Sequence, residues 1–434
     1  MTNHVADRRE KMTTLVGSVR VPRAYKTELE PTLSQIQQFE QHAGAARWVW
    51  NWALGRKKEA MELNRLPIEP IRIPTAYDLC AEIVQLKRST HSWLARVSKM
   101  VPEEVLEDLD FAFRMLYVNH FGFPRPKSKK WCKKSFRLKG NCPTMLRVIE
   151  VRKRRIKLPF LGWIRVKHGH AGYLPITPNE GVKIHSATVS EQAGRWFVSL
   201  SVEEQRPEPK SIEGPVVGVD LGISRLATVS DGTLIVNPKP FLRLERRLAH
   251  RQRALARRQK DSANHWKAVR SLQRLHRRIT NARKDCLHKA TTMLAKTKSV
   301  IVVEDLSVQA MMKNHCLAKS IADVSWSQFV RQLEYKTPWY GSRLVKVDRF
   351  FPSTKTCSNC GLIKAKMSLA ERTFKCECGL VMDRDLNAAI NLSRWPAVGR
   401  TLETPVRDEK LQVRKPVLIG EAGISFQTHD DAGE

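Results

Sequence analysis

Residues 215–231, PVVGVDLGISRLATVSD, decide the fold of the second half of this chain. They begin with an apolar run, residues 216–219, that is typical of a buried strand and leads directly into Asp220. A second apolar run, residues 226–229, returns before the turn at Asp231-Gly232, and together the runs predict a β-hairpin. A buried carboxylate is normally paired or holds a metal. The pattern thus leaves two interpretations of Asp220, as a turn cap or as a metal ligand.

Two later stretches also carry carboxylates at the ends of regular elements. Residues 300–306, VIVVEDL, predict a central strand that ends in Glu304 and Asp305. Residues 382–392, MDRDLNAAINL, predict a helix with acids in its first turn. Acids at this position can also simply stabilise the helix through its dipole. Acids so far apart in sequence are what a ribonuclease H-like sheet brings together to hold two divalent ions. The three stretches therefore favour a metal site over three unrelated caps.

Composition and charge restrict the class of protein. The chain has 434 residues, 42% of them hydrophobic, so we expect a folded protein of several domains. Its net charge of +33 indicates a polyanionic partner, because neutralising phosphates releases counterions. A membrane surface would attract the same charge, but no apolar run approaches the roughly 20 residues that span a bilayer. The first residues lack the apolar core of a signal peptide, which indicates an intracellular protein.

Four of the nine cysteines lie close together, as a Cys-x-x-Cys pair and a Cys-x-Cys pair. They are Cys357, Cys360, Cys376 and Cys378. Four thiolates suit a tetrahedral structural zinc ion, and a glycine after each pair allows a tight knuckle. The second pair has a shorter spacing than Cys-x-x-Cys, which leaves open whether all four sulfurs bind. The alternative is a set of reduced free thiols.

The remaining chain separates into segments of different pattern. Residues 16–29 alternate as a strand, and Thr32 and Thr75 begin predicted helices with capping boxes. Residues 146–204 hold short strands at close spacing, which favours a small barrel. Residues 242–298 predict a long helical stretch without proline, and residues 241–290 carry sixteen Lys and Arg against three acids. That charge density favours contact with nucleic acid over a solvated basic face.

Two tryptophans of the first predicted helix have two interpretations. Trp48 and Trp52 are four residues apart, so they share one helix face. Packing in the core is the ordinary role for such a pair, and contact with bases is the alternative.

In combination, several motifs resemble the TnpB proteins of bacterial transposons, relatives of the type V CRISPR effector nucleases. The motifs are GVDLG, VVEDL, CSNCG with CECG, and DRDLNAA, together with YKTELEPT, GAARWVWNWAL and FPRPKSKK nearer the N-terminus. The resemblance covers roughly residues 17 to 393. It implies an RNA-guided DNA endonuclease that binds a guide RNA, cleaves double-stranded target DNA, and itself recognises a short motif beside the target.

The resemblance also implies a fold and its domains. The expected fold is multidomain α+β, a ribonuclease H-like (RuvC) nuclease domain with an inserted zinc ribbon, plus an N-terminal β-barrel wedge domain interrupted by a helical recognition lobe. The expected domains are 1–30 leader and first wedge strand, 31–123 helical recognition lobe, 124–212 wedge β-barrel, 213–355 first segment of the RuvC nuclease domain, 356–379 zinc ribbon, 380–396 second segment of the RuvC nuclease domain, and 397–434 disordered tail.

Site residues follow from the motifs position by position. Asp220, Glu304 and Asp385 correspond to the catalytic carboxylates, which would hold two Mg²⁺ ions. Asp385 is preferred to Asp383 because the acid of the family motif stands two positions before the Asn. The four cysteines would bind structural Zn²⁺. Further basic residues are expected to contact nucleic acid: Lys57, Lys129, Lys130, Arg247, Arg251, Arg258, Arg274, Arg278 and Arg384.

Other classes of protein share features of the pattern. They are a miniature type V CRISPR effector, a guided DNA-binding repressor with weak or no cleavage, and a strand-joining transposase. The intact set of acids argues against the repressor, and the lack of a separate transposase DNA-binding domain argues against the transposase. The expected location is the bacterial cytoplasm, at the nucleoid when the protein is on its target. The sequence leaves open the guide RNA, the recognised motif, the cut pattern, the genomic context, and whether the protein is a monomer or a dimer on RNA.

Overall fold

The computed structural model describes residues 18–66, 69–130, 132–140, 148–167, 174–175, 177, 181–368 and 371–395. Within these residues the chain forms two compact units, the first ending at Pro207 and the second beginning at Glu208. The expected leader before residue 18 and the expected disordered tail, 397–434, lie outside the described residues. No helix in the described residues is both long and apolar enough to cross a membrane.

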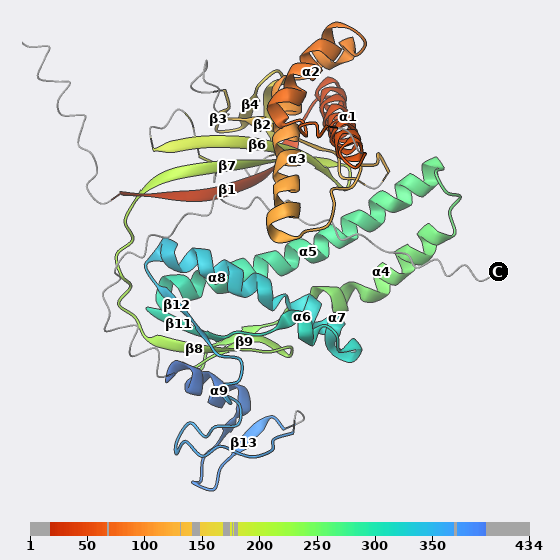
Figure 1. Ribbon diagram of the computed structural model, residues 1–434. Helices are drawn as coiled ribbons and strands as arrows, with labels where there is room; N and C mark the ends of the chain where they lie inside the picture. The colour runs from red at the N-terminus through yellow and green to blue at the C-terminus, as the bar shows by residue number, and fades with distance from the viewer. Residues whose placement is uncertain are drawn as a thin grey trace, which may run out of the picture. The chain divides into compact units, whose positions relative to one another are not determined.

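The first unit is built on a seven-stranded antiparallel sheet with the order β2-β6-β7-β1-β5-β4-β3 (Figure 1). Its strands are β1 (Ser18–Glu30), β2 (Ser135–Lys139), β3 (Glu150–Arg152), β4 (Arg155–Leu158), β5 (Gly162–Val166), β6 (Val182–Gln192) and β7 (Arg195–Pro207). Ala193 and Gly194 join β6 to β7 with φ angles of 55° and 79°. A two-residue hairpin of type I′ needs positive φ at both positions, so this turn sets the register of the two strands.

The predicted strands are present, but the predicted barrel is not. In the residues that the structure describes, β2 and β3 stand at opposite ends of the sheet and do not pair with each other. A barrel closes its sheet and leaves no such ends. The expected small barrel is therefore not detected in the described residues of the first unit, whose strands form a seven-stranded sheet.

Helices follow β1 in the first unit. They are α1 (Leu33–Leu63), α2 (Ala76–Arg88), the 3₁₀ turn η2 (Ser92–Arg96) and α3 (Met100–Asn119). The predicted capping boxes are confirmed, with Thr32 paired to Gln35 at the start of α1 and Thr75 paired to Asp78 at the start of α2. Each box satisfies backbone N–H groups that the first helical turn leaves without partners.

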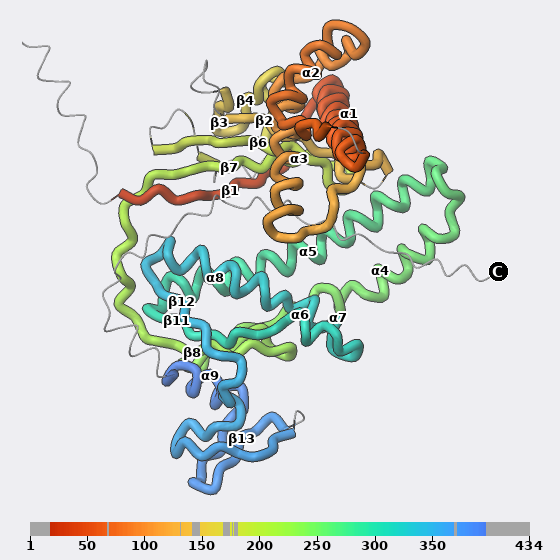
Figure 2. The backbone as a smooth tube through the Cα atoms, viewed as in Figure 1, coloured from red at the N-terminus to blue at the C-terminus, as the bar shows by residue number. Residues whose placement is uncertain are grey.

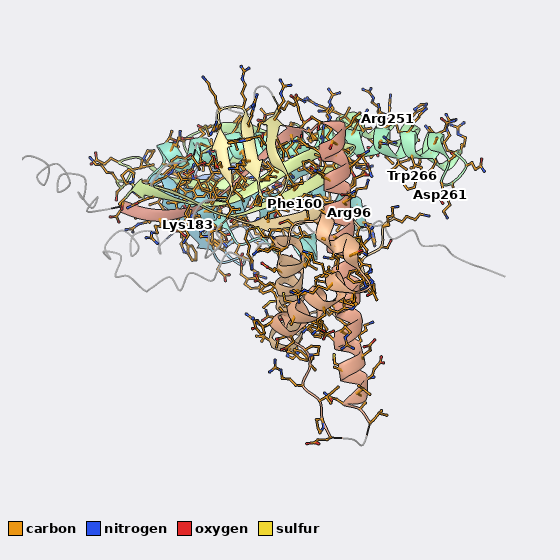
Figure 3. All side chains as sticks on the ribbon, turned by 90° about the horizontal axis from the view of Figure 1, so that it is seen from above. Arg96, Phe160, Lys183, Arg251, Asp261 and Trp266 are labelled. Atoms are coloured by element: carbon orange, nitrogen blue, oxygen red, sulfur yellow. The ribbon has the colours of Figure 1, made fainter. Side chains whose placement is uncertain are left out.

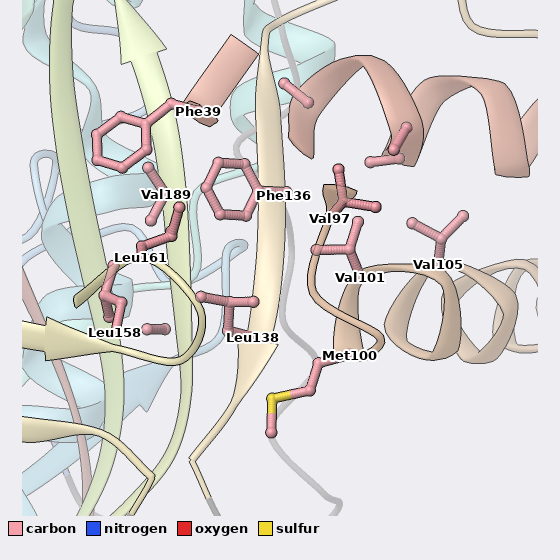
Figure 4. Close-up of a cluster of buried hydrophobic side chains, with 14 of the residues drawn as sticks. Phe39, Val97, Met100, Val101, Val105, Phe136, Leu138, Leu158, Leu161 and Val189 are labelled. Atoms are coloured by element: carbon pink, nitrogen blue, oxygen red, sulfur yellow. The ribbon is translucent and has the colours of Figure 1, made fainter. Parts of the chain in front are cut away.

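These helices share one hydrophobic core with the sheet (Figure 4). Phe39 of α1 packs against Phe136 of β2, with 6.0 Å between the ring centroids. Val101 of α3 and Leu138 of β2 are completely buried in the same cluster. Burial of this apolar surface is the main force that holds the helices on the sheet.

The second unit contains a five-stranded sheet with the order β10-β9-β8-β11-β12. Its strands are β8 (Val216–Leu221), β9 (Arg225–Val229), β10 (Leu234–Val236), β11 (Val300–Glu304) and β12 (Arg343–Val347). The predicted hairpin is confirmed as the antiparallel pair β8 and β9, whereas β11 runs parallel to both β8 and β12. Parallel strands need a long crossover, and here the crossover from β8 to β11 contains two long helices.

Both faces of this sheet are covered (Figure 2). On one face, Ile301 and Val303 pack with Phe329 of helix α8 (Trp326–Tyr340). On the other face, Val300 and Val302 pack with Leu392 of helix α9 (Arg384–Ser393). Two buried faces explain why β11 is a continuous run of apolar residues rather than an alternating one.

The long helical stretch predicted for residues 242–298 is two helices. They are α4 (Pro240–Ala256) and α5 (Ala263–Thr297). Between them Asp261 takes a φ of 66°, and the Ser262 side chain then caps α5 by accepting from the His265 N–H. The chain therefore reverses into a helical hairpin. The short helices α6 (Val308–Met311) and α7 (His315–Val324) lie between β11 and α8.

We expect Gly218→Ala to destabilise the second unit. A Cβ built on Gly218 of β8 would lie 2.0 Å from the Ala389 carbonyl oxygen of α9, so strand and helix would have to separate. Overpacking of this kind costs about 1–3 kcal/mol, which should lower the urea midpoint of unfolding. Gly122→Ala is the control, because its Cβ would meet nothing within 4 Å. Equal midpoints for the two variants would contradict the close packing of α9 on β8.

Candidate functional site

The register of two strands brings two of the predicted acids together. Val219 of β8 lies opposite Val303 of the parallel strand β11, so Asp220 and Glu304 are the next residues along adjacent strands. Successive side chains of a strand alternate between faces. Gly218 of β8 contacts α9, so Asp220, two residues on, faces the same side of the sheet. Glu304 shares this face with Val302.

The third predicted acid comes from the helix that covers this face. Asp385 lies in the first turn of α9, which packs on β8. Burial, together with the nearby carboxylates of Asp385 and Glu304, raises the pKa of Asp220 to about 8. Burial also raises the pKa of Glu304, against the opposing effect of a hydrogen bond. Asp385 and Glu304 therefore both lie within electrostatic reach of Asp220.

Three carboxylates in one partly buried place repel each other when ionised, and a bound cation would relieve that repulsion. Carboxylate oxygens are also the ligands that Mg²⁺ prefers. The residue types therefore suit divalent cations, although these three acids are not among the described side chains close enough to share a single ion.

Asp383 and Asp305, the neighbours of the predicted acids, have other partners. The Asp383 carboxylate caps α9 by accepting from the backbone N–H groups of Asp385 and Leu386, at 3.0 and 3.2 Å. Its second oxygen forms an ion pair with Arg225 of β9, at 3.1 Å. Asp305 is half exposed and pairs with Arg349 at 2.9 Å. Asp383 thus orients the helix that carries Asp385.

The residues that hold Glu304 in place were not predicted from the sequence. The Ser353 hydroxyl donates a hydrogen bond to the Glu304 carboxylate. The Asn391 side chain of α9 in turn donates to the Ser353 carbonyl oxygen, at 2.8 Å. Asn387 and Asn391 are buried polar residues four positions apart among the inward-facing residues of α9. That unusual placement was the one available indication of a supporting network.

The four predicted zinc ligands converge. The sulfur atoms of Cys357, Cys360, Cys376 and Cys378 all lie within 4.8 Å of one another. Among the described residues, this is the one group of three or more metal-ligating side chains close enough to hold a single ion. The two thiols of the shorter Cys-x-Cys pair therefore lie close to the other two. Four cysteine sulfurs are a ligand set typical of structural zinc.

The glycines after each cysteine pair have the backbone that the knuckles require. Gly361 and Gly379 take φ angles of 76° and 89°, which residues with a Cβ rarely adopt. The backbone N–H of Leu380, just after the second knuckle, is the main group that lowers the pKa of Cys378 to about 6. A lowered pKa favours the thiolate form of cysteine, which is the form that binds metal.

The knuckles are joined directly to the helix that carries Asp385. The short strand β13 (Thr373–Lys375) leads into the second knuckle, and β14 (Val381–Asp383), which pairs with it, leads from the knuckle into α9. Asn387 of α9 accepts from the Ser358 N–H at 3.0 Å and donates to the Thr356 carbonyl oxygen at 2.7 Å. The cysteine cluster thus packs beside the acids and fixes one end of α9.

The α4–α5 hairpin exposes most of the basic residues predicted to contact nucleic acid (Figure 3). The exposed side chains are Arg247, Arg258, Arg274 and Arg278. Arg251 instead donates to the Ser271 carbonyl oxygen at 2.6 Å and ties the two helices together. A groove on α5 is lined by Arg274, Arg277, Arg278, Asn281, Ala282 and Asp285.

Other predicted contacts differ in their surroundings. Lys57 is a correction: its side chain is buried, forms an ion pair with Asp110 at 2.8 Å, and so is not a surface contact. Lys129 and Lys130 are exposed. Arg384 lies beside the acids, 3.4 Å from the Asp385 carboxylate, with only 11% of its side chain exposed. Its contact with phosphate stays a prediction.

Comparison with known proteins identifies the family. Residues 199–315 match the OrfB_IS605 family, described as "Probable transposase", and residues 326–392 match "Cas12f1-like, TNB domain". Residues 21–65 match a family described as "Helix-turn-helix domain", although here they form strand β1 and the single helix α1. The chain belongs to the TnpB (OrfB_IS605) family, as the motifs indicated.

Individual relatives agree over most of their length. A Streptomyces pristinaespiralis protein named "Putative RNA-guided DNA endonuclease" is 35% identical, over 86% of this chain and 89% of its own. An Escherichia coli K12 protein named "Putative RNA-guided DNA endonuclease InsQ" is 32% identical, over 85% and 91%. A solved Cas12f1-sgRNA-target DNA complex aligns with a TM-score of 0.49 at 16% identity, over 83% of this chain and 82% of that one.

We expect the purified protein to contain zinc bound by the cysteine cluster. Elemental analysis should find about one ion per chain, since four thiolates complete a tetrahedral site. Cys360→Ser and Cys378→Ser should lose the ion and lower the melting temperature, because a small knuckle depends on its metal. Cys316→Ser, an exposed cysteine outside the cluster, should keep it. Full zinc content in Cys378→Ser would show that the cluster is not the metal site.

Proposed function

We propose that this chain is an RNA-guided DNA endonuclease whose cleavage site consists of Asp220, Glu304 and Asp385. The observation that carries the proposal is the placement of the three acids on two adjacent parallel strands and on the helix packed against them. The names of the relatives that match most of the chain give the same activity. The substrate is double-stranded DNA selected by a guide RNA, beside a short motif that the protein recognises.

The three carboxylates would hold two Mg²⁺ ions in the proposed site. When bound, such ions supply activation of a water molecule and compensation of charge at the phosphate being cleaved. A two-ion site spreads its ligands over two centres, so its carboxylates need not gather as closely as four thiols around one zinc ion.

The protein's own residues hold the acids in position. Ser353 donates to Glu304 and Asn391 holds the Ser353 backbone, while Asp383 and Arg225 fix the start of α9 and hence Asp385. Arg384 places a positive charge beside Asp385. Preorganised charges of this kind lower the cost of assembling the reacting groups.

The rest of the chain supports binding of nucleic acid. The exposed arginines of the α4–α5 hairpin suit contact with the phosphate backbone. The net charge of +33 means that many Lys and Arg side chains would have no acidic partner even if every Asp and Glu formed an ion pair. We also propose the domain assignment that the family resemblance implies, with residues 31–123 as recognition lobe and the seven-stranded sheet as wedge. It is supported by β1 pairing with β7 although the helices α1 to α3 lie between them in sequence.

The catalytic assignment is tested with guided plasmid cleavage. Guide RNA is first identified by sequencing RNA that copurifies with the protein. Asp220→Ala, Glu304→Ala and Asp385→Ala should each lose Mg²⁺-dependent cleavage and retain guided binding, because each removes an oxygen ligand. Asp305→Ala should cleave normally, since Asp305 is half exposed and paired with Arg349.

Cleavage at the wild-type rate by any one of the three variants would remove that residue from the site. Wild-type protein that binds its guided target but never cuts it would contradict the endonuclease proposal and favour a guided repressor.

The basic hairpin is tested by the salt dependence of binding. Each lost phosphate contact reduces the slope of log K against log salt by about 0.9 on duplex DNA, so the double variant Arg274→Gln, Arg278→Gln should flatten it by roughly 2. Lys289→Gln is the control, because Lys289 of α5 already pairs with Asp285 at 2.7 Å. An unchanged slope in the double variant would show that this face does not meet phosphate.

A further inference from the structure

Four rings form a cluster on the helices of the first unit, which we call the aromatic cluster: Trp48, Trp52, His91 and Trp93. Trp48 and Trp52 are parallel, with 6.0 Å between ring centroids and 5° between ring planes. Trp93 meets Trp48 edge-on at 5.4 Å, and His91 lies 4.7 Å from Trp48. The cluster is thus made where η2 and the residue before it pack against α1.

The cluster lies at the edge of the core, because Trp48 and Trp52 pack against the hydrophobic core of the first unit while Trp93 reaches the surface. Trp93 is 38% exposed, and Trp48 and Trp52 are only partly buried. None of their three indole N–H groups donates a hydrogen bond to another described residue. Trp50 of the same helix differs from them. It is buried, and its indole N–H donates a hydrogen bond to the Arg125 carbonyl oxygen at 3.0 Å. The cluster therefore offers ring faces and donors that the first unit does not use.

Two glycines leave open space along the same stripe of α1. Gly44 stands four residues before Trp48 and Gly55 three residues after Trp52, and a Cβ at either position would meet nothing within 4 Å. Glycine weakens a helix relative to alanine. No close packing within the described residues requires glycine at these two positions, and the space beside each is open.

Three cations, Lys87, Arg88 and Arg96, lie near the rings of the cluster along the chain. Arg96 lies three residues after Trp93 in η2, and residues i and i+3 of a 3₁₀ helix stand on the same side. Lys87 and Arg88 occupy the last turn of α2, just before His91. None of these three cations forms an ion pair with another described residue. Aromatic rings with free positive charges beside them fit a ligand that combines flat rings with phosphates.

We propose that the aromatic cluster binds an unpaired nucleobase of a single-stranded nucleic acid, with its flanking phosphates on Lys87, Arg88 and Arg96. The proposal rests on the proposed function, which supplies the nucleic acid. Stacking requires a base that is not already stacked in a duplex, so the occupant is single-stranded. Guide RNA and the displaced DNA strand present the same chemistry, and the experiment distinguishes them.

The first test is photocrosslinking on the full-length protein. Oligouridine and oligothymidine of about 12 nucleotides, each with one iodinated pyrimidine, span a single-strand site of ordinary size. Irradiation should attach the iodinated base to peptides that contain Trp48, Trp52 or Trp93, as mapped by mass spectrometry. The stronger crosslink identifies the source as RNA or DNA. A blunt duplex of the same length should give no crosslink there.

The second test is the affinity of variants for the same two oligonucleotides. Trp93→Ala should bind roughly 5- to 100-fold more weakly, as expected for loss of one stacked base. Trp93→Phe should recover most of that loss. Tyr77→Ala is the matched control, because Tyr77 is an exposed aromatic residue of α2 at 85% exposure, away from the cluster. Gly44→Ala and Gly55→Ala should raise the melting temperature yet weaken binding, which a purely structural role would not produce.

The outcomes separate this proposal from the proposed function. Normal affinity of Trp93→Ala together with no crosslink to the cluster would overturn the base-binding site, while binding by the wild-type protein would leave the guided nuclease intact. Wild-type protein that binds neither oligonucleotide would overturn both.

Discussion

Helix α9 lies directly on strand β8, and at Gly218 no side chain separates the two backbones. This close approach fixes the position of α9, and therefore of Asp385, relative to strands β8 and β11. It places the first turn of α9 over the ends of β8 and β11, where alternation along the strands has already turned Asp220 and Glu304 to that face. A larger residue at position 218 would hold helix and strand apart and move Asp385 away from its two partners.

The cysteine cluster also helps to fix the position of α9. A knuckle of this size cannot bury enough apolar surface to hold itself together, so a bound ion would supply its stability. Its backbone is fastened to α9 through Asn387 and Asn391, and Asn391 also holds the segment that carries Ser353 against Glu304. The cysteine cluster, helix α9 and Glu304 are thus linked by hydrogen bonds, so the candidate metal site and the candidate catalytic acids share partners.

The cationic side chains of the protein fall into two groups. Some cations are already paired, such as Lys57 with Asp110 and Arg283 with Asp323, and these hold elements together. Others, above all the exposed arginines of the α4–α5 hairpin, project to solvent. Ion pairs within the protein satisfy only the first group, so the second group remains available to an anionic partner such as phosphate. Charge counts alone do not separate the two.

Patterns that act over a few residues were sufficient to predict much of this protein. The hairpin of β8 and β9, the buried strand β11, the capping boxes at Thr32 and Thr75 and the four clustered cysteines all follow from local periodicity and spacing. The family, and with it the three acids proposed as catalytic, followed from short motifs for the same reason.

What only the tertiary structure decided depends on contacts between residues far apart in sequence. The strand order of the seven-stranded sheet, the burial of Lys57, and the break between α4 and α5 contradict or refine local expectations. The different roles of Asp383 as cap and Asp385 as candidate ligand depend on Arg225, which is 158 residues away from Asp383. Local patterns specify which residues are polar or apolar, whereas packing decides which polar groups are already paired and which remain available to a ligand.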